Sequence, residues 1–412
     1  MVNFEITGKI SIGKETETFK PYEEKEYSSG WVNKSLNYNI VSGDNRFNLR
    51  NRGGFFKDGH GDVYLFSKDG VDANGNKVKG EMFKIPWKER LTHPRLPEVV
   101  MWKKWIVELE KPGFRWELQN ALDKVKDGGE LTEEEIAKFG ASDVKGLTAA
   151  LEKSQKKRKE FVTEADFVDF VHKVITSGKY ADKQFKVTGT YDMQYSEENQ
   201  KFYCNYVPQR IYLVENEEES ATANMTFFYD HTSLVDAKEE KGKYYVNGYV
   251  QVYDNNRKEN VFAPYAVTIP AAKDDSDLEK KREKIQVGRF TVEDEDTVYE
   301  YGIIVNLLSG AQKTELTEDM LTEEQQDSIL LGELTLDDIR RELGSVYGDR
   351  VVENVFVKPA RGFSKGREET SYAPEDLIIK PLAKEETSAF EDTADDNEDL
   401  FADDDDDDSL FD

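Results

Sequence analysis

The chain has 412 residues with 37% hydrophobic and 12% aromatic side chains, enough apolar material for two or three domains with their own cores. No apolar run approaches the roughly 20 residues needed to cross a bilayer, and the residues after Met1 lack the pattern of a secretion signal. A single cysteine, Cys204, excludes an internal disulfide framework, and four scattered histidines offer no paired metal spacing. We therefore expect a cytoplasmic protein with no metal, no cofactor and no membrane partner.

The net charge of −28 is unevenly distributed along the chain. Residues 1–115 hold 20 Lys and Arg against 16 Asp and Glu, a net of +4, whereas residues 385–412 hold a net of −15. Residues 116–384 carry the remaining −17. A mildly basic N-terminal part joined to a strongly acidic C-terminal segment is compatible with a phosphate-bearing ligand that the acidic segment imitates.

Residues 1–112 have the pattern of short strands separated by turns. Apolar residues alternate with polar ones, and Ser42-Gly43-Asp44-Asn45 provides a tight reversal between two such runs. Strands are expected at 4–10, 36–40, 46–49, 63–66 and 101–109. This pattern predicts an OB-like β domain, that is, a small barrel, over residues 1–112.

From residue 113 the spacing of apolar residues becomes helical, which predicts a helical insert over 113–178. Thr132-Glu133-Glu134-Glu135 is a capping box, and Thr163 is expected to begin a further helix. Because Phe161, Phe167 and neighbouring apolar residues form one face, we interpret the insert as scaffold.

A second β-rich region is predicted over 179–309, and an OB-like fold would also accommodate it. Its strands are expected at 185–191, 202–214, 225–229, 244–253, 261–269 and 299–307. No sequence repeat relates this region to the first, so the sequence leaves open whether the two form one barrel or two. Residues 310–384 are predicted to contain a helical segment over 311–344, with a capping box at Thr322, and then an extended collar.

The strongest candidate binding surface lies between Trp31 and Phe66, where aromatic and cationic residues are interleaved. Unpaired bases expose faces that stack on aromatic rings, and their phosphates need cations, so single-stranded nucleic acid suits this mixture. The candidate residues are Trp31, Lys34, Arg46, Phe47, Arg50, Arg52, Phe55, Phe56 and Lys57. The same aromatic residues would also suit a barrel core, and we expect Trp31, Phe55 and Phe56, which follow glycine-containing turns, at the surface.

Other sequence patterns give weaker evidence for function. The second β region is rich in tyrosine and would provide a further stacking platform, although amphipathic strands explain these residues equally well. The loop from Gly70 to Glu81 imitates a calcium-binding loop, but Gly70 stands where the first aspartate belongs. The sequence contains no phosphate-binding loop, dinucleotide fingerprint or hydrolase motif. We therefore predict that the protein is not an enzyme.

The last 28 residues, 385–412, contain fifteen carboxylate side chains and no Lys or Arg. Repulsion among like charges and few apolar residues predict a disordered segment. Its tip, Leu410-Phe411-Asp412, combines two apolar side chains with carboxylates, which suits a small apolar pocket rimmed by cations on a partner. The alternative is an acidic tail that only maintains solubility.

This acidic segment resembles the C-terminus of prokaryotic and phage single-stranded-DNA-binding proteins, in which a disordered acidic tail with a hydrophobic tip recruits replication and repair partners. The resemblance covers less than a tenth of the chain. It departs from the bacterial pattern at the tip, because bacterial members usually end on Pro-Phe whereas Asp412 follows Phe411 here. The resemblance implies single-stranded DNA as ligand, replication or recombination proteins as partners of the tip, and the bacterial host's cytoplasm if the chain is phage-encoded.

Together these features predict an α+β protein with β-rich, OB-like barrel regions, a helical insertion and a disordered acidic tail. Its predicted function is sequence-independent binding of single-stranded DNA in replication, recombination or repair, with a tail that competes with DNA and recruits partners. Two other classes remain open. One is a non-enzymatic interaction or virion-assembly protein whose acidic tail docks on a basic partner, and the other is an OB-containing nucleic-acid enzyme with acidic metal ligands.

Overall fold

The computed structural model describes residues 1–71, 77–272, 276–313, 321–322, 328–331, 335, 347–362 and 366–380. The acidic segment 385–412, including Leu410, Phe411 and Asp412, lies outside the described residues, as does most of the helix expected over 311–344. No helix within the described ranges is long and apolar enough to cross a membrane.

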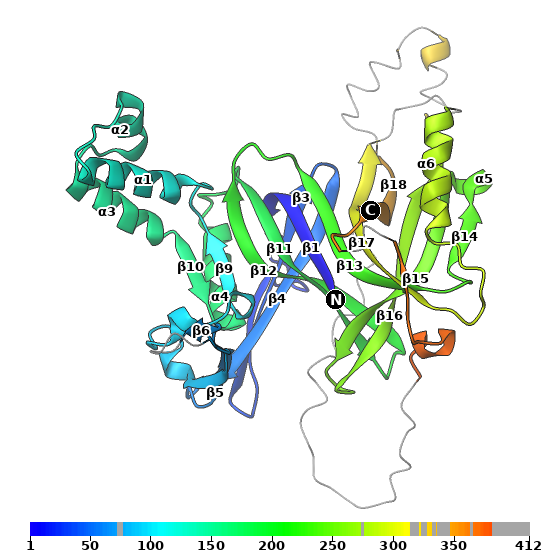
Figure 1. The fold of residues 1–412 in the computed structure, drawn as a ribbon, viewed down its shortest axis with the longest axis horizontal. Coiled ribbons are helices and arrows are strands. Elements are labelled where there is room, and N and C mark those ends of the chain that lie inside the picture. The colour runs from blue at the N-terminus through cyan, green and yellow to red at the C-terminus, as the bar shows by residue number, and fades with distance from the viewer. Residues whose placement is uncertain are drawn as a thin grey trace, which may run out of the picture.

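Most of the described strands belong to one mixed sheet of 15 strands, which confirms the strand-rich, mixed class that the sequence predicts (Figure 1). Two small sheets stand apart from it. One pairs β5 (Asp62–Phe66) with β8 (Met82–Pro86), and the other pairs β6 (Gly70–Val71) with β7 (Lys77–Val78).

Five strands of the large sheet pair in a closed ring, which we name the first ring. Strand β1 (Val2–Ser11) pairs with β3 (Trp31–Ser42) on one side and with β11 (Gln184–Ser196) on the other. β3 continues into β4 (Asn45–Phe56), and β12 (Lys201–Val214) closes the ring by pairing with β11 and, in parallel, with β4. β2 (Tyr22–Glu26) adds to the free edge of β3.

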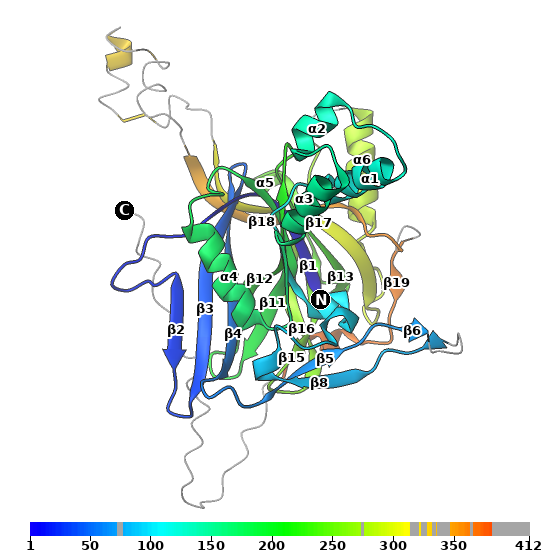
Figure 2. The same ribbon diagram turned by 90° about the vertical axis from the view of Figure 1, so that its left-hand side faces the viewer.

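The hairpin β3–β4 is amphipathic in the way that strand alternation requires. Gly43, at φ 60°, makes the tight turn predicted between the two strands. Along each strand, every second side chain points to the same side of the hairpin, and on one side these side chains are buried in the core. These are Leu36, Tyr38, Ile40, Phe47 and Leu49. Helix α4 (Glu164–Thr176), which follows β4 and precedes β11, lies against this hairpin and contributes Phe167 to the same core (Figure 2).

A second ring repeats the pairing order of the first. Strand β13 (Ser220–Tyr229) pairs with β15 (Lys243–Asp254) and with β17 (Tyr299–Lys313). β15 continues into β16 (Glu259–Pro270), and β18 (Tyr347–Pro359) closes the ring by pairing with β17 and, in parallel, with β16. Along the chain, helix α6 (Asp277–Gly288) follows β16 and precedes β17, just as α4 follows β4 and precedes β11.

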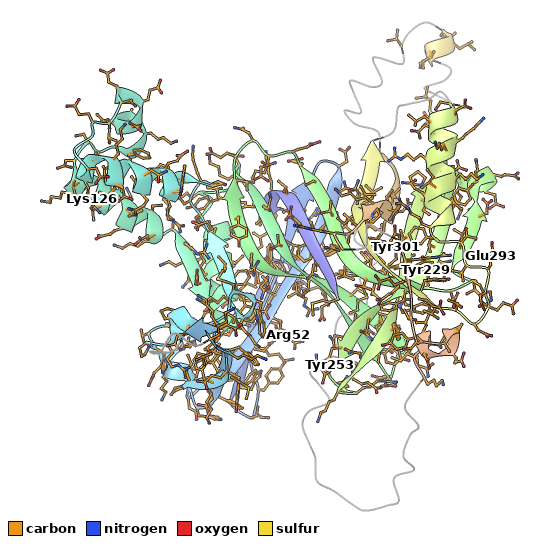
Figure 3. All side chains as sticks on the ribbon, viewed as in Figure 1. Arg52, Lys126, Tyr229, Tyr253, Glu293 and Tyr301 are labelled. Carbon is orange, nitrogen blue, oxygen red and sulfur yellow. The ribbon has the colours of Figure 1, made fainter. Side chains whose placement is uncertain are left out.

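Aromatic side chains fill the second ring. Tyr229 and Tyr301 lie together inside it (Figure 3), and both contact the buried ring of Phe290. The Tyr229 hydroxyl donates a hydrogen bond to the Arg289 carbonyl at 2.7 Å, so this buried polar group is satisfied. The cores of the two rings form one continuous apolar cluster.

The two rings are joined by strand pairing rather than by a linker. β1 of the first ring pairs antiparallel with β13 of the second, and the Ser309 amide donates to the Asn45 side-chain oxygen at 2.9 Å. The hairpin β11–β12 belongs to the first ring although it lies within the range 179–309, so residue 179 is not the point at which one ring gives way to the next. The division of the chain into domains stays a prediction.

The predicted helical insert contains a separate three-helix module, which projects from one end of the sheet (Figure 1). Helices α1 (Phe114–Lys126), α2 (Glu133–Phe139) and α3 (Val144–Gln155) enclose a small core of their own. Strand β9 (Trp105–Glu108) leads into the module and β10 (Arg158–Phe161) leads out of it.

Two predicted helix starts are confirmed, whereas α6 lies where only strands were predicted. The capping box is confirmed, because the Glu135 amide donates to the Thr132 hydroxyl at 3.2 Å and the Thr132 amide donates to the Glu135 carboxylate at 2.8 Å. Thr163 caps α4 as expected. Two boundaries were wrong. Residues 101–103 form a short 3-10 turn before β9, and β17 continues to residue 313, where helix was expected from 311, because β18 pairs with it there.

The remaining elements pack on the outside of the second ring. β14 (Leu234–Ala237) pairs with the edge of β15, as β2 does with β3, and the short helix α5 (Lys238–Lys241) follows it. After β18 and the two-residue β19 (Glu368–Glu369), the chain crosses the outside of the ring. There Tyr372 lies 5.0 Å from Phe262 between ring centroids, and Leu377 is fully buried.

Neighbouring residues on opposite sides of β4 test this architecture. We expect Phe47→Ala to lower the free energy of unfolding by about 3–5 kcal/mol, because it leaves a cavity in a packed core. Arg46→Ala, on the exposed side, should change it by no more than about 0.5 kcal/mol. Chemical denaturation followed by circular dichroism measures both. Equal effects of the two substitutions would contradict the assigned register of β4.

Candidate nucleic-acid interface

The side of the β3–β4 hairpin that faces away from the core is the candidate interface, and we name it the outer face. The strand register pairs Trp31 with Phe56 at one end and Val41 with Arg46 at the other, so these pairs and every second pair between them point the same way. Most of these side chains are half-buried or exposed. The outer face comprises Trp31, Asn33, Asn37, Asn39, Arg46, Asn48, Arg50, Arg52 and Phe56.

Three arginines lie along β4 on this face. Arg46, Arg50 and Arg52 are separated by four residues and two residues, or about 13 Å and about 7 Å at the usual rise of a strand. Arg46 is exposed and pairs with no carboxylate of the described residues. The Arg52 Nε donates to the Asn33 side-chain oxygen at 3.2 Å, which fixes its guanidinium on the face (Figure 3). The row can follow a line of phosphates.

Aromatic rings occupy the end of the outer face beyond the arginines. Trp31 and Phe56 meet edge to face, with centroids 5.0 Å apart and an interplanar angle of 78°. His60 stacks on Phe56 at 4.0 Å. Gly54 makes this arrangement possible, because a Cβ there would overlap the indole ring of Trp31. The half-exposed rings of Trp31 and Phe56 provide surfaces on which a base can stack.

Strand alternation separates three of the predicted residues from this face. Phe47 is 1% exposed and its ring packs against Tyr206, so it is a core residue and we do not retain it as a stacking residue. Phe55 stacks on Trp87 at 5.2 Å and 9° on the other side of the sheet. Lys34 lies beside it and pairs with Asp169 at 2.8 Å, with its side chain only 12% exposed.

Lys57, the last predicted residue, follows the hairpin and is well exposed. Its Nζ pairs with the Glu26 carboxylate at 2.6 Å, a contact that solvent screens and that costs little to exchange for a phosphate. The structure thus brings together five of the nine predicted residues on the outer face, namely Trp31, Arg46, Arg50, Arg52 and Phe56. Lys57 lies at the end of the hairpin, next to β2.

Sequence reasoning missed the amide side chains of the outer face. Asn33, Asn37 and Asn39 on β3, with Asn48 on β4, alternate with the core residues and can donate and accept hydrogen bonds with base edges. The signal was available, because the two-residue period of the strands and the reversal at Ser42-Gly43-Asp44-Asn45 fix which residues face one another.

A buried hydrogen-bond network holds the hairpin in place behind Arg52. The Tyr38 hydroxyl donates to the Asn51 side-chain oxygen at 3.1 Å. The Asn51 amide donates to the Glu164 carboxylate at 2.7 Å and to the Pro208 carbonyl at 2.8 Å. The Arg52 backbone amide also donates to the Glu164 carboxylate, at 3.3 Å. The network therefore ties β4 to the start of α4 and to β12.

Burial raises the pKa of the Glu164 carboxyl from its usual value of 4.5 to about 7, although the hydrogen bonds from Asn51 and Arg52 favour the charged form. The nearby charge of Asp192 acts in the same direction as burial. Close packing explains the burial, because a Cβ at Gly53 would overlap the backbone of Ala165 at the start of α4. The buried network behind the outer face thus contains one titratable group, the Glu164 carboxyl.

Comparisons with known proteins give few relatives. No protein-family model matches the chain, and no curated protein matches it. Among solved structures, wild-type single-stranded DNA binding protein from Thermus aquaticus is similar over 75% of this chain and 85% of that chain, with 9% identity and a TM-score of 0.26. A deletion mutant of the same protein is similar over 75% of this chain and 87% of that chain, with 8% identity and a TM-score of 0.25.

Titration of Glu164 gives a testable consequence. Its folded-state pKa lies above its unfolded-state pKa, so its contribution to stability is complete below about pH 4.5 and is lost as the pH rises through about 7. We expect Glu164→Gln, which keeps a hydrogen-bond acceptor and cannot ionise, to be more stable than the unmodified protein at pH 8.5 by an amount of the order of 1 kcal/mol. The advantage should shrink towards pH 5. Thermal unfolding at both pH values measures it, and an advantage independent of pH would contradict the raised pKa.

Proposed function

We propose that this chain is a non-enzymatic protein that binds single-stranded DNA without sequence preference, in the cytoplasm, during DNA replication, recombination or repair. We also propose that its first ring is an OB-like barrel. Two observations support the barrel. The five strands pair in the order first, second, third, fifth, fourth and back to the first, and α4 stands between the third and fourth strands. An OB fold is a five-stranded barrel whose second and third strands carry the ligand face.

The outer face is the observation that carries the functional proposal. It lies on β3 and β4, the second and third strands of the first ring, and it combines a row of arginines with half-exposed aromatic rings. In the proposed mechanism bases stack on Trp31 and Phe56, and the arginines track the phosphates. The asparagines supply hydrogen bonds that any base can use, since an amide both donates and accepts.

The acidic segment 385–412 is proposed to regulate this face and to recruit partners. Its fifteen carboxylates would compete with DNA phosphates for the arginines. When DNA occupies the face, Leu410 and Phe411 would be available to a replication or recombination protein. The described chain ends beside the second ring, where the Arg257 guanidinium donates to the Lys380 carbonyl at 2.8 Å. A random chain of 28 residues spans roughly 30 Å, which sets the reach of the segment.

The salt dependence of binding tests the role of the arginines. Replacing Arg50 and Arg52 together by alanine should weaken binding to oligo-dT and reduce the slope of log affinity against log salt by up to about 1.4, since each phosphate contact on a single strand contributes about 0.7. Lys126→Ala, a cation on the distant three-helix module (Figure 3), is the control and should leave the slope unchanged. An unchanged slope in the arginine double variant would remove the outer face as the binding surface.

Removal of residues 385–412 tests the regulatory part separately. We expect the shortened chain to bind oligo-dT more tightly, because a competing polyanion has been removed, and to become more sensitive to added heparin. Replacing Asp403–Asp408 by asparagine should have a smaller effect in the same direction. Equal affinities of the shortened and full chains would reject competition by the tail and leave DNA binding itself intact. A virion-assembly protein that acts only through its tail would not be retained on a single-stranded-DNA column in either form.

A further inference from the structure

A second aromatic surface lies on the β5–β8 hairpin, outside the first ring. The register pairs Tyr64 with Lys84 and Phe66 with Met82, so these four side chains share one side of the hairpin. The alternate residues, which include Leu65 and the buried Phe83 and Ile85, face a small core instead. We name the first side, together with Trp102 and Lys103, the hairpin platform.

The platform exposes more large apolar surface than a small hairpin normally leaves in water. Tyr64 is 57% exposed, Met82 62% and Trp102 56%. Single exposed apolar residues are common, but several gathered on one side mark an interaction surface. Trp102 and Phe66 lie together there, with ring centroids 5.2 Å apart and planes tilted by 39°.

Hydrogen bonds fix the platform to the first ring. Trp102 belongs to the short 3-10 turn after Val100, whose amide donates to the Phe66 carbonyl at 2.9 Å. The Gln209 side chain of β12 donates to the Trp102 carbonyl at 2.6 Å, and Arg210 donates to the Met101 carbonyl at 3.4 Å. β12 also pairs with β4, the strand that carries the arginines of the outer face, so β12 is a direct neighbour of both surfaces.

The charges on the platform favour a polyanion over an apolar protein surface. The Lys103 Nζ lies 5.8 Å from the Phe66 ring centroid and 5.7 Å from that of Trp102, and no carboxylate of the described residues pairs with it. Lys84 is 63% exposed and, among the described residues, forms its ion pair with Asp62 at 2.7 Å. The insertion as a whole, residues 57–104, contains 10 Lys and Arg against 7 Asp and Glu.

We propose that the hairpin platform is a second stacking site for the same single strand of DNA. Bases that extend beyond the outer face stack on Trp102 and Tyr64, and Lys103 and Lys84 contact their phosphates. This inference rests on the proposed function, and it lengthens the binding site beyond what one ring supplies. The site then depends on a hairpin inserted between β4 and α4, whose aromatic side faces solvent.

The length of the oligonucleotide separates the two surfaces. An oligo-dT of about 8 nucleotides is expected to occupy one ring, and one of about 30 nucleotides to reach both surfaces. The variant Tyr64→Ala with Trp102→Ala should bind the long strand about 10- to 100-fold more weakly and the short strand as well as the unmodified protein does. Trp102→Phe should retain most of the long-strand affinity, because it keeps a ring. Trp116→Ala, which removes an even more exposed tryptophan from α1, is the matched control and should alter neither affinity.

Lys103→Glu is the companion variant, because it leaves the rings in place and depends on no change in packing. It should also weaken the long strand selectively. If the alanine double variant and Lys103→Glu both bind the long strand normally, the platform is not a DNA site, and a loss of self-association by sedimentation would assign it to a second copy of the chain instead. That result leaves short-strand binding, and so the proposed function, untouched. Failure of the unmodified protein to bind either length would overturn the proposed function and the platform together.

Discussion

The two-residue alternation of the β3–β4 hairpin is the constraint that determines both the core and the proposed binding surface of the first ring. On one side of the hairpin, Phe47 and the residues that alternate with the outer face are buried in the core. The other side must then present Arg46, Arg50 and Arg52 together. The buried bonds from Asn51 to Glu164 and Pro208 keep the hairpin in this register against α4 and β12. Stability and the proposed ligand contacts therefore come from the same strands, and a slip by one residue would lose both.

The two rings share a pairing order but differ on the outside. On β3–β4 the outer face is polar and carries arginines, whereas neither β15 nor β16 contains an arginine, and β16 presents Phe262, Pro264 and Ala266. The chain itself covers part of that apolar side with Tyr372 and Leu377. The same strand arrangement thus provides the proposed DNA surface in one ring, and in the other ring it binds the chain segment that contains Tyr372 and Leu377.

The sequence predicted local structure well because local rules govern it. Thr132 and Thr163 begin helices through their own hydrogen bonds, and alternation located nine of the ten strands of the two rings, missing β18. Prediction from the sequence failed where strand pairing depends on residues that are far apart in the chain. The pairing of β11–β12 with the N-terminal strands, and the shared order of the two rings, leave no trace in residue similarity. Within the site, composition identified the arginines, but treating Trp31 to Phe66 as one stretch mixed residues such as Lys34 and Phe47 from the opposite side of the sheet.

All five tryptophans lie between Trp31 and Trp116, so selectively excited tryptophan fluorescence reports on the N-terminal part alone. The most direct test is a fluorescence titration at low ionic strength with oligo-dT and with a duplex of equal length. We predict quenching by the single strand and much less by the duplex, with the change in fluorescence reduced in Trp31→Phe. A protein shortened to residue 384 that still shows no response to oligo-dT would contradict the central claim.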